Sequence, residues 1–274
     1  MKRAFVIGHP ITHSRSPLIH GTWIKQHAIA GTYEAVDVTP EALPGFIERL
    51  REGEFVGGNV TIPHKEAVFA LCDSVDPLAR TIGAVNTLVR QPDGSIHGLN
   101  TDYMGFLGNL DQALPGWSQG VETAVVLGAG GASRAVLVAL QRRGITTIHL
   151  LNRTLDKAEA LAAELGGGIV AGRLSDYGKV ASAAGLLVNT TSVGMHETKF
   201  DALDLTLLSP HCIVTDIVYV PLITPLLADA KASGRRIVDG LGMLLHQAVP
   251  GFEAWFGVRP EVTVQLRDKV AATL

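Results

Sequence analysis

The chain has 274 residues, of which 47% are hydrophobic and 18% are charged, and its formal net charge is −3 at pH 7. This length predicts two domains or one large domain, and the composition is typical of a globular protein that can fill sizeable cores. No basic cluster is longer than two adjacent residues, which argues against nucleic-acid binding through phosphate contacts.

The two cysteines, Cys72 and Cys212, lie far apart in the sequence. They form neither a CxxC pair nor a disulfide framework, which indicates a reducing cytosol. The apolar run that follows Lys2-Arg3 is too short for a signal peptide, and no stretch of about 18 apolar residues predicts a membrane span. We therefore expect a cytoplasmic protein with no membrane partner.

The first third of the chain alternates short β-branched apolar runs with helix-like runs. Strands are predicted at residues 4–7, 33–38, 55–60, 84–90 and 95–99, and helices at 17–27, 40–51 and 64–71. This alternation predicts crossover units and a largely parallel sheet. The turn signal Gln91-Pro92-Asp93-Gly94 predicts a hairpin between the last two strands, and so at least one antiparallel pair.

A helix is expected from Asp102 to a turn-rich stretch at residues 114–120, after which the rhythm restarts. Further strands are predicted at 122–127, 147–151, 186–190, 213–219 and 236–238, and C-terminal helices at 242–255 and 261–273. The sequence therefore predicts an α/β protein of two domains, with the boundary at or just before the turn-rich stretch.

The segment G-H-P-I-T-H-S-R-S-P-L-I-H, from Gly8 to His20, concentrates three histidines in thirteen residues. Prolines at positions 10 and 17 spoil the helical spacing that metal ligands would need, and no cysteine or carboxylate cluster completes a shell. We expect no metal there, and nothing else in the sequence calls for a serine nucleophile. Ser14 and Ser16 can face one ligand if the turn is extended, and Arg15 would then point to solvent.

The segment G-G-N-V-T-I-P-H-K places Asn59 and Thr61 at a strand end and Lys65 in the first turn of a helix. Ligands of open α/β sheets lie at the carboxyl ends of strands. A cation opposes the helix dipole at that position, which indicates a functional lysine, although a solvated lysine is the commoner alternative.

Two more polar segments follow in the same part of the chain. G-A-V-N-T contains Asn86, and G-L-N-T-D-Y-M-G places Asp102 at a helix start, where by itself it would be read as a helix cap.

V-V-L-G-A-G-G-A-S-R-A, from Val125 to Ala135, follows a strand and opens a helix. Gly128 and Gly130 fit a dinucleotide-binding turn, with Ser133 where the third glycine would stand. A glycine turn without a ligand is the alternative. The residues expected to cradle the pyrophosphate are Gly128, Ala129, Gly130, Gly131 and Ala132. Beside the three polar segments, this motif indicates a substrate with many hydroxyls and one oxidisable carbon.

The second strand of that unit ends without the acid that an NAD site usually carries. Asn152-Arg153-Thr154 follows it instead, with Lys157 one turn on. Arg153, Thr154 and Lys157 can bind a phosphate, which favours NADP. Alternatively, Thr154 caps the helix and the two cations are solvated, and Asp156 could either repel a phosphate or face away.

These segments together resemble a shikimate dehydrogenase from end to end. The matching segments are Gly8–His20, Asn59–Lys65, Gly83–Thr87, Asn100–Gly105, Gly128–Ala135, Asn152–Thr154, Asn189–Met195, Asp216–Leu227 and Asp239–Gln247. One departure is His20-Gly21, where the family often has His-Asn or His-Gln. We expect it to matter little, because Gly21 lies inside the first helix.

The resemblance implies NADPH-dependent, reversible reduction of 3-dehydroshikimate to shikimate in aromatic amino-acid biosynthesis. It implies that the catalytic pair is Lys65 and Asp102. It implies that the carboxylate is bound by Ser14 and Ser16, and the ring hydroxyls by Asn59, Thr61, Asn86, Asp102 and Gln247. It implies that the nicotinamide half is lined by Thr190, Thr191, Ser192, Met195, Ile217 and Gly240, with Tyr219 between cofactor and substrate.

The resemblance also implies that the C-terminal helices pack back on the first domain. We therefore predict a substrate-binding domain at residues 1–104 plus 241–274 and a Rossmann-type NADP-binding domain at 105–240, in a monomer or homodimer. One rival is a quinate or dual quinate/shikimate dehydrogenase that uses NAD. A catalytically silent binding protein, the other rival, would be expected to lack Lys65 or Asp102.

Overall fold

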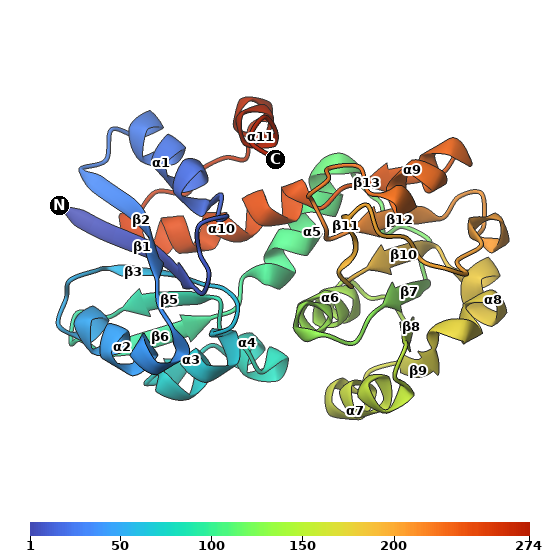
Figure 1. The fold of residues 1–274 in the computed structure, drawn as a ribbon, viewed down its shortest axis with the longest axis horizontal. Helices are drawn as coiled ribbons and strands as arrows, with labels where there is room; N and C mark the ends of the chain where they lie inside the picture. Colours follow the sequence, from blue (N-terminus) through green and yellow to red (C-terminus); the bar gives the residue numbers. More distant parts are fainter. The chain divides into compact units, whose positions relative to one another are not determined.

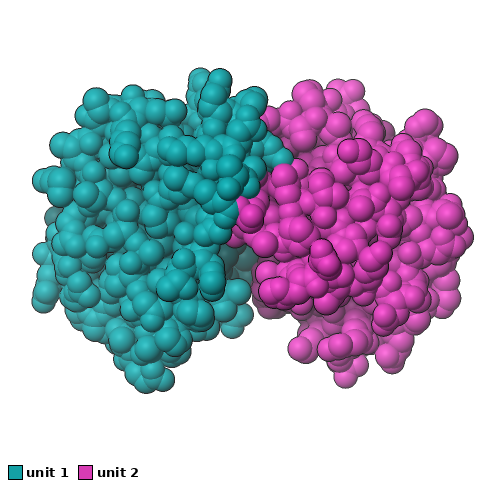
Figure 2. All heavy atoms as spheres, turned by 45° about the horizontal axis from the view of Figure 1, so that its top comes forward, with its two compact units in different colours: residues 1–102, 245–273 teal, residues 103–244, 274 magenta.

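The computed structural model describes residues 1–274 and divides them into two units (Figure 2). Unit 1 is Met1–Asp102 with Leu245–Thr273, and unit 2 is Tyr103–Leu244 with Leu274. The chain passes from one unit to the other inside two helices, α5 (Asp102–Ala113) and α10 (Leu241–Phe256). None of the helices combines the length and apolarity needed to cross a membrane.

Unit 1 is built on a six-stranded sheet in the order β2-β1-β3-β5-β6-β4 (Figure 1). Its strands are β1 Lys2–Gly8, β2 Gly31–Asp37, β3 Gly57–Val60, β4 Ser74–Val75, β5 Thr87–Arg90 and β6 Ile96–Leu99. The hairpin of β5 and β6 is confirmed, and β3 also pairs antiparallel with β5, whereas the other three pairs are parallel. The prediction of a mostly parallel sheet with an antiparallel pair is therefore confirmed.

Helices cover both faces of this sheet. They are α1 Ser16–Gln26, α2 Leu43–Arg51, α3 Lys65–Leu71, α4 Pro77–Ile82, the C-terminal part of α10, and α11 Val264–Ala271. Phe5 of β1 packs with α2 on one face. On the other face, Trp255 of α10 donates a hydrogen bond to the Leu88 carbonyl, and Trp23 of α1 donates one to the Glu261 carbonyl. The C-terminal helices thus return to the first unit, as expected.

Unit 2 is built on a second six-stranded sheet, in the order β13-β12-β10-β7-β8-β9. Its strands are β7 Thr123–Leu127, β8 Thr147–Asn152, β9 Ile169–Arg173, β10 Leu186–Asn189, β12 Ile213–Asp216 and β13 Arg236–Val238. Every pair is parallel. Counted along the chain from β7, the order is 3-2-1-4-5-6 of a Rossmann fold, which confirms the predicted fold class.

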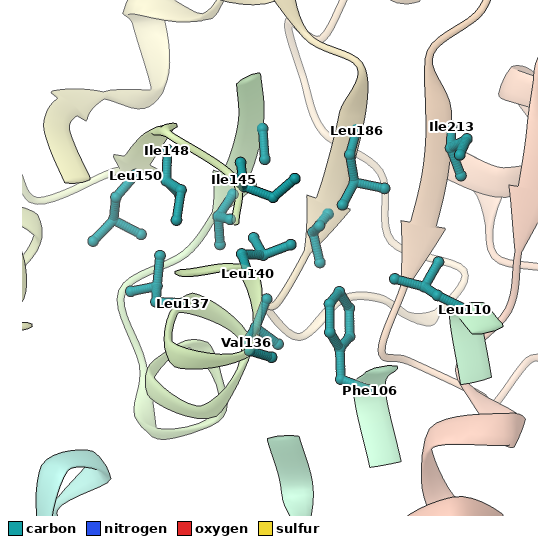
Figure 3. Close-up of a cluster of buried hydrophobic side chains, with 14 of the residues drawn as sticks. Phe106, Leu110, Val136, Leu137, Leu140, Ile145, Ile148, Leu150, Leu186 and Ile213 are labelled. Atoms are coloured by element: carbon teal, nitrogen blue, oxygen red, sulfur yellow. The ribbon is translucent and has the colours of Figure 1, made fainter. Parts of the chain in front are cut away.

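The helices of unit 2 bury both faces of this sheet. They are α5, α6 Gly131–Arg142, α7 Leu155–Leu165, α8 Tyr177–Val180 and α9 Pro225–Ala232. Figure 3 shows one face, where Phe106 of α5 and Leu137 and Leu140 of α6 pack against Ile148 and Leu186 of the strands. α8 and α9 cover the other face. Since both faces are covered, the strands are continuous apolar runs rather than alternating ones.

Three strands were not predicted from the sequence: β4, β9 and β11 (Val193–His196). β9 reads I-V-A-G-R after three glycines, so its apolar signal is weak. The strand predicted at 213–219 instead ends at Asp216, because the Val218 amide donates to the Asp216 side chain rather than to a neighbouring strand.

Candidate functional site

Lys65 and Asp102 form an ion pair, with 2.6 Å between Lys65 Nζ and Asp102 Oδ2. Each is the first residue of its helix, Lys65 of α3 and Asp102 of α5. Their side chains are 31% and 15% exposed, so the pair is partly sheltered but remains accessible. A carboxylate thus compensates the cation that the dipole of α3 disfavours, and both charges lie within unit 1.

Asn86 fixes the other oxygen of this carboxylate. Its Nδ2 donates to Asp102 Oδ1 at 2.8 Å. Its Oδ1 in turn accepts from the Thr101 amide at 2.9 Å and from Thr87 Oγ1 at 2.9 Å. Asn86, Thr87 and Thr101 are all buried. The orientation of Asp102 is therefore set by a buried network, and that of Lys65 follows from Asp102.

Asn59 extends this network toward β2. Its Nδ2 donates to the Asn86 carbonyl at 3.3 Å and to Thr87 Oγ1 at 3.2 Å, and its Oδ1 accepts from the Tyr33 hydroxyl at 2.7 Å. Both hydrogens of the amide are engaged within the protein. Asn59 therefore braces Asn86 and Thr87, whereas Thr61 is half-buried at the strand end with no hydroxyl bond of this kind.

The two predicted serines lie at the start of α1. Ser14 Oγ accepts from the Ser16 amide at 3.3 Å, and Ser16 is buried while Ser14 is half-buried. The condition of an extended turn is not met, because Arg15 has helical backbone angles. Arg15 does not point to solvent either: its Nη2 donates to the Thr273 carbonyl at 2.5 Å. The guanidinium thus ties this turn to the C-terminal end of unit 1.

The three histidines of this segment diverge. His9 lies 3.0 Å from Asp37, and His13 is exposed. His20 is completely buried and stacks on Tyr33 with 4.0 Å between ring centroids. Burial lowers the pKa of His20 to about 3, so the ring is neutral at physiological pH. Neither ring nitrogen has a hydrogen-bond partner that meets normal geometry.

The glycine turn of unit 2 joins β7 to α6. Gly128 has a φ of +102°, and a Cβ at this position would lie 2.6 Å from Thr191 Cγ2, so only glycine fits. The Ala129 amide donates to Asn152 Oδ1 at 3.2 Å, and Gly130 precedes α6 without a side-chain cap. Gly130 and Gly131 face open space. The N-terminus of α6 can therefore accept an anion.

The end of β8 presents an exposed cationic group. Arg153, Thr154 and Lys157 are all exposed, as is Asp156. Thr154 occupies the N-cap position of α7 but makes no capping hydrogen bond, so the simple capping alternative does not hold. The register of β8 and β9 adds Arg173, which the sequence did not predict, beside Asn152 at the same edge.

The remaining predicted cofactor residues follow β10 and β12. Thr190 Oγ1 donates to the Leu127 carbonyl at 2.8 Å, which holds it against the glycine turn. Ser192 and Met195 are exposed, and Thr191 is half-buried. Gly240 packs against the backbone of Ile217. Tyr219 is half-buried in unit 2, and Gln247 is buried in unit 1, where its carbonyl accepts from Thr101 Oγ1 at 2.8 Å.

Four buried polar residues at these strand ends were missed: Thr87, Thr101, Asn189 and Asp216. Burial raises the pKa of Asp216, against three hydrogen bonds that lower it. Each of the four stands beside or within a quoted motif at one end of a strand: Thr87 at the start of β5, and the other three at or just after the last residue of a strand. A polar residue in that position is the signal that could have identified them.

Three family models of shikimate dehydrogenases match successive parts of the chain. The shikimate dehydrogenase substrate binding domain matches residues 6–88, the shikimate/quinate 5-dehydrogenase family matches 113–211, and the shikimate 5'-dehydrogenase C-terminal domain matches 240–264. An NADP(+) shikimate dehydrogenase of Mesorhizobium japonicum is 56% identical over 273 residues, which cover 100% of this chain and 97% of that protein.

Two solved structures have the same fold over their whole length. Shikimate 5-dehydrogenase of Thermus thermophilus, in complex with NADP(H) and shikimate, is 39% identical with a TM-score of 0.85, covering 100% of this chain and 99% of that one. Quinate dehydrogenase of Corynebacterium glutamicum, in complex with NAD, is 31% identical with a TM-score of 0.91, covering 100% and 99%. The chain therefore belongs to the shikimate dehydrogenase family.

Proposed function

We propose that this protein catalyses the reversible, NADP-dependent interconversion of 3-dehydroshikimate and shikimate. The observation that carries the proposal is the Lys65–Asp102 ion pair, oriented by Asn86 at the ends of three strands of unit 1. A silent binding protein would be expected to lack Lys65 or Asp102, and both are present. We assign substrate binding to unit 1 and cofactor binding to unit 2.

The cofactor, when bound, supplies the hydride that reduces the C3 carbonyl of the substrate. The chain must stabilise and protonate the alkoxide that develops on the carbonyl oxygen. Lys65 Nζ has three hydrogens and gives one to Asp102 Oδ2, so it keeps donors for the substrate oxygen. Asp102 has both oxygens engaged, by Lys65 and Asn86. We therefore assign the proton transfer to Lys65 and its orientation to Asp102.

The reverse reaction uses the same groups. The cofactor would take the hydride from the C3 carbon of shikimate, and the C3 hydroxyl would give its proton to Lys65, which releases it to solvent. In the direction of reduction, one carbonyl, one NADPH and one proton give one alcohol and one NADP⁺. General acid–base assistance of this kind is typically worth about 10²–10⁴ in rate.

Substrate binding is assigned to polar groups of unit 1. Ser14 and Ser16 offer hydroxyls for the carboxylate at the start of α1, and Thr61, Asn86 and Gln247 offer polar groups for the ring hydroxyls. The ring would be oriented by several weak contacts rather than by one strong one. Tyr219 of unit 2 is assigned to the contact between cofactor and substrate.

NADP binding is assigned to unit 2, whose residues fit the cofactor. The uncapped N-terminus of α6 suits the pyrophosphate, and Arg153, Thr154 and Lys157 suit the 2′-phosphate of the adenosine ribose. The loops that follow β10 and β12 would hold the nicotinamide. The absence of an acid at the tip of β8 favours NADP over NAD.

We further propose that the enzyme works in the cytoplasm as a monomer or homodimer. Two free thiols, Cys72 and Cys212, suit a reducing compartment.

The test is a spectrophotometric assay of nicotinamide reduction with shikimate and with quinate, each against NADP and NAD. The proposal predicts the highest kcat/KM for shikimate with NADP. Faster turnover of quinate with NAD would instead identify the chain as a quinate dehydrogenase. No turnover of either substrate would overturn the assignment.

A further inference from the structure

Asp216 is the centre of a fully buried hydrogen-bond network in unit 2. Its Oδ1 accepts from Asn189 Nδ2 at 2.9 Å and from the Val218 amide at 2.9 Å, and its Oδ2 accepts from Thr224 Oγ1 at 2.7 Å. Asn189, Asp216 and Thr224 are each 0% exposed. Asn189 and Asp216 are Cα partners at the last position where β10 and β12 pair.

The network fixes the loop that follows β10. Asn189 Oδ1 accepts from the Thr191 amide at 3.0 Å and from Thr191 Oγ1 at 2.7 Å, and Asn189 Nδ2 also donates to the Val193 carbonyl at 2.8 Å. The orientation of the Asn189 amide therefore determines the path of this loop. Asp216 sets that orientation, because a carboxylate can only accept and so requires the Nδ2 end of Asn189.

The same carboxylate fixes the loop that follows β12. By accepting from the Val218 amide it turns the chain away from the sheet directly before Tyr219. Thr224, at the N-cap of α9, closes the loop from the other side and also accepts from the Leu227 amide. One side chain thus holds both loops to which the nicotinamide half is assigned.

Gly194 shows how closely the two loops pack at this point. Its φ is +110°, and a Cβ there would lie 3.2 Å from Thr224 Cβ and 3.5 Å from Asp216 Oδ2. The backbone of β11 therefore lies directly against the network. A change in the position of Thr224 or Asp216 would be transmitted to the Val193–Met195 segment.

Asp216 is a costly choice for a purely structural role. None of the ion pairs of the chain includes Asp216. Burial raises the pKa of its carboxyl group, and three hydrogen bonds oppose that rise. An anion without a counter-charge is expensive to bury, and an apolar side chain of similar volume is often at least as stable. What an apolar residue cannot do is accept three hydrogen bonds from two loops at once.

We propose that Asp216 is a positioning residue for hydride transfer, which holds the β10 and β12 loops in the geometry that binds the nicotinamide half of the cofactor. The proposal rests on the proposed function for the identity of the ligand. Asp216 touches neither substrate nor cofactor in this account, and acts through Asn189, Val218 and Thr224.

The test compares ligands that use different parts of the protein. Binding of NADPH, of adenosine 2′,5′-bisphosphate and of shikimate is measured by calorimetry for the wild type and for Asp216→Ala. We expect the Kd of NADPH to rise by roughly tenfold or more, as for the loss of one to two net hydrogen bonds. The Kd values of the bisphosphate, which lacks the nicotinamide half, and of shikimate should change less than about twofold.

Two further variants separate positioning from stability. Asp216→Asn keeps an oxygen for Asn189 and Val218, so it should restore much of the NADPH affinity. Asp204→Ala is the matched control. Like Asp216, Asp204 accepts from a backbone amide and a threonine hydroxyl in unit 2, both of Thr206, but it is exposed. It should leave all three Kd values unchanged.

Equal weakening of NADPH and of the bisphosphate would overturn the proposal, as would unchanged NADPH binding in Asp216→Ala. If Asp216→Ala does not fold, Thr224→Val, which removes the bond to Asp216 Oδ2 together with the long N-cap bond from the Leu227 amide, must show the same selective loss. These readouts need no turnover. A wild type that binds NADPH but does not oxidise shikimate would refute the proposed function and leave this test intact.

Discussion

In the proposed function, the choice of cofactor is assigned most directly to Arg153. Its guanidinium is exposed at the end of β8, where an NAD site would carry an acid. We expect Arg153→Ser to lower kcat/KM for NADPH by roughly 10- to 100-fold, as for the loss of a charge-assisted hydrogen bond, while kcat/KM for NADH stays within about twofold. Steady-state kinetics with both cofactors measure this.

The control is Arg142→Ser, which removes an exposed arginine at the C-terminal end of α6, whereas the anion site is proposed at the N-terminal end of that helix. It should leave both values unchanged. A parallel fall for NADPH and NADH in Arg153→Ser would contradict a role at the 2′-phosphate.

His20 makes the stability of the protein sensitive to acid. Because its pKa is lowered to about 3 in the folded protein, from 6.5, the unfolded chain takes up the proton first as the pH falls. The stability that the protein gains by keeping His20 neutral is fully present above pH 6.5 and is lost as the pH falls toward 3. Between pH 7 and pH 5 the free energy of unfolding should fall by about 2 kcal/mol from this group.

His20→Phe should remove that part of the pH dependence. Urea unfolding at the two pH values measures the free energy of unfolding for each protein. Equal losses in the wild type and in His20→Phe would show that the ring is protonated in the folded state.

At the scale of elements, the β7–α6 turn of the proposed cofactor site tolerates little change. Gly128→Ala combines a φ of +102° with a methyl group 2.6 Å from Thr191. We expect the Kd of NADPH to rise at least about tenfold while shikimate binding is unchanged, because unit 1 is untouched. Calorimetric titration of both ligands measures this.

Gly144→Ala is the matched control. Gly144 has a φ of +87°, a Cβ added there would meet no neighbouring atom, and the residue lies in the turn at the other end of α6. It carries the backbone strain without the contact with Thr191. Equal NADPH affinity in the two variants would contradict the close approach at Gly128.

Most elements could be predicted from the sequence because their signals are local. Alternation of apolar runs, the glycine turn before α6, and the turn residues before β6 each specify structure within a few positions. β9 was missed because Gly172 interrupts a short run after three glycines. The hydrogen bonds from Asn59 to Thr87, from Thr101 to the Gln247 carbonyl and from Asn189 to Asp216 could not be predicted, since they join residues that lie far apart in the sequence.

Arg15, in the turn at Ser14–Ser16, also has a partner that the sequence alone could not predict. Two serines two positions apart can face one ligand only if the turn is extended, and Arg15 would then point outward. The partner of Arg15 is the carbonyl of Thr273, which lies 258 residues away in sequence, so no local pattern contains that contact.

For the whole molecule, each of the two units has its own sheet and core. Substrate and cofactor are assigned to separate units, so their binding can be measured separately. In the proposed function, catalysis requires both ligands and uses the Lys65–Asp102 pair to protonate the developing alkoxide.

The most direct test is therefore the variant Lys65→Met, assayed with saturating NADPH and 3-dehydroshikimate. We predict that kcat falls by about 10²–10⁴ while the Kd of shikimate changes only modestly, because Lys65 acts mainly in the transition state. Lys25→Met, at an exposed position of α1, should retain full kcat. A folded Lys65→Met enzyme with near wild-type kcat would contradict the account.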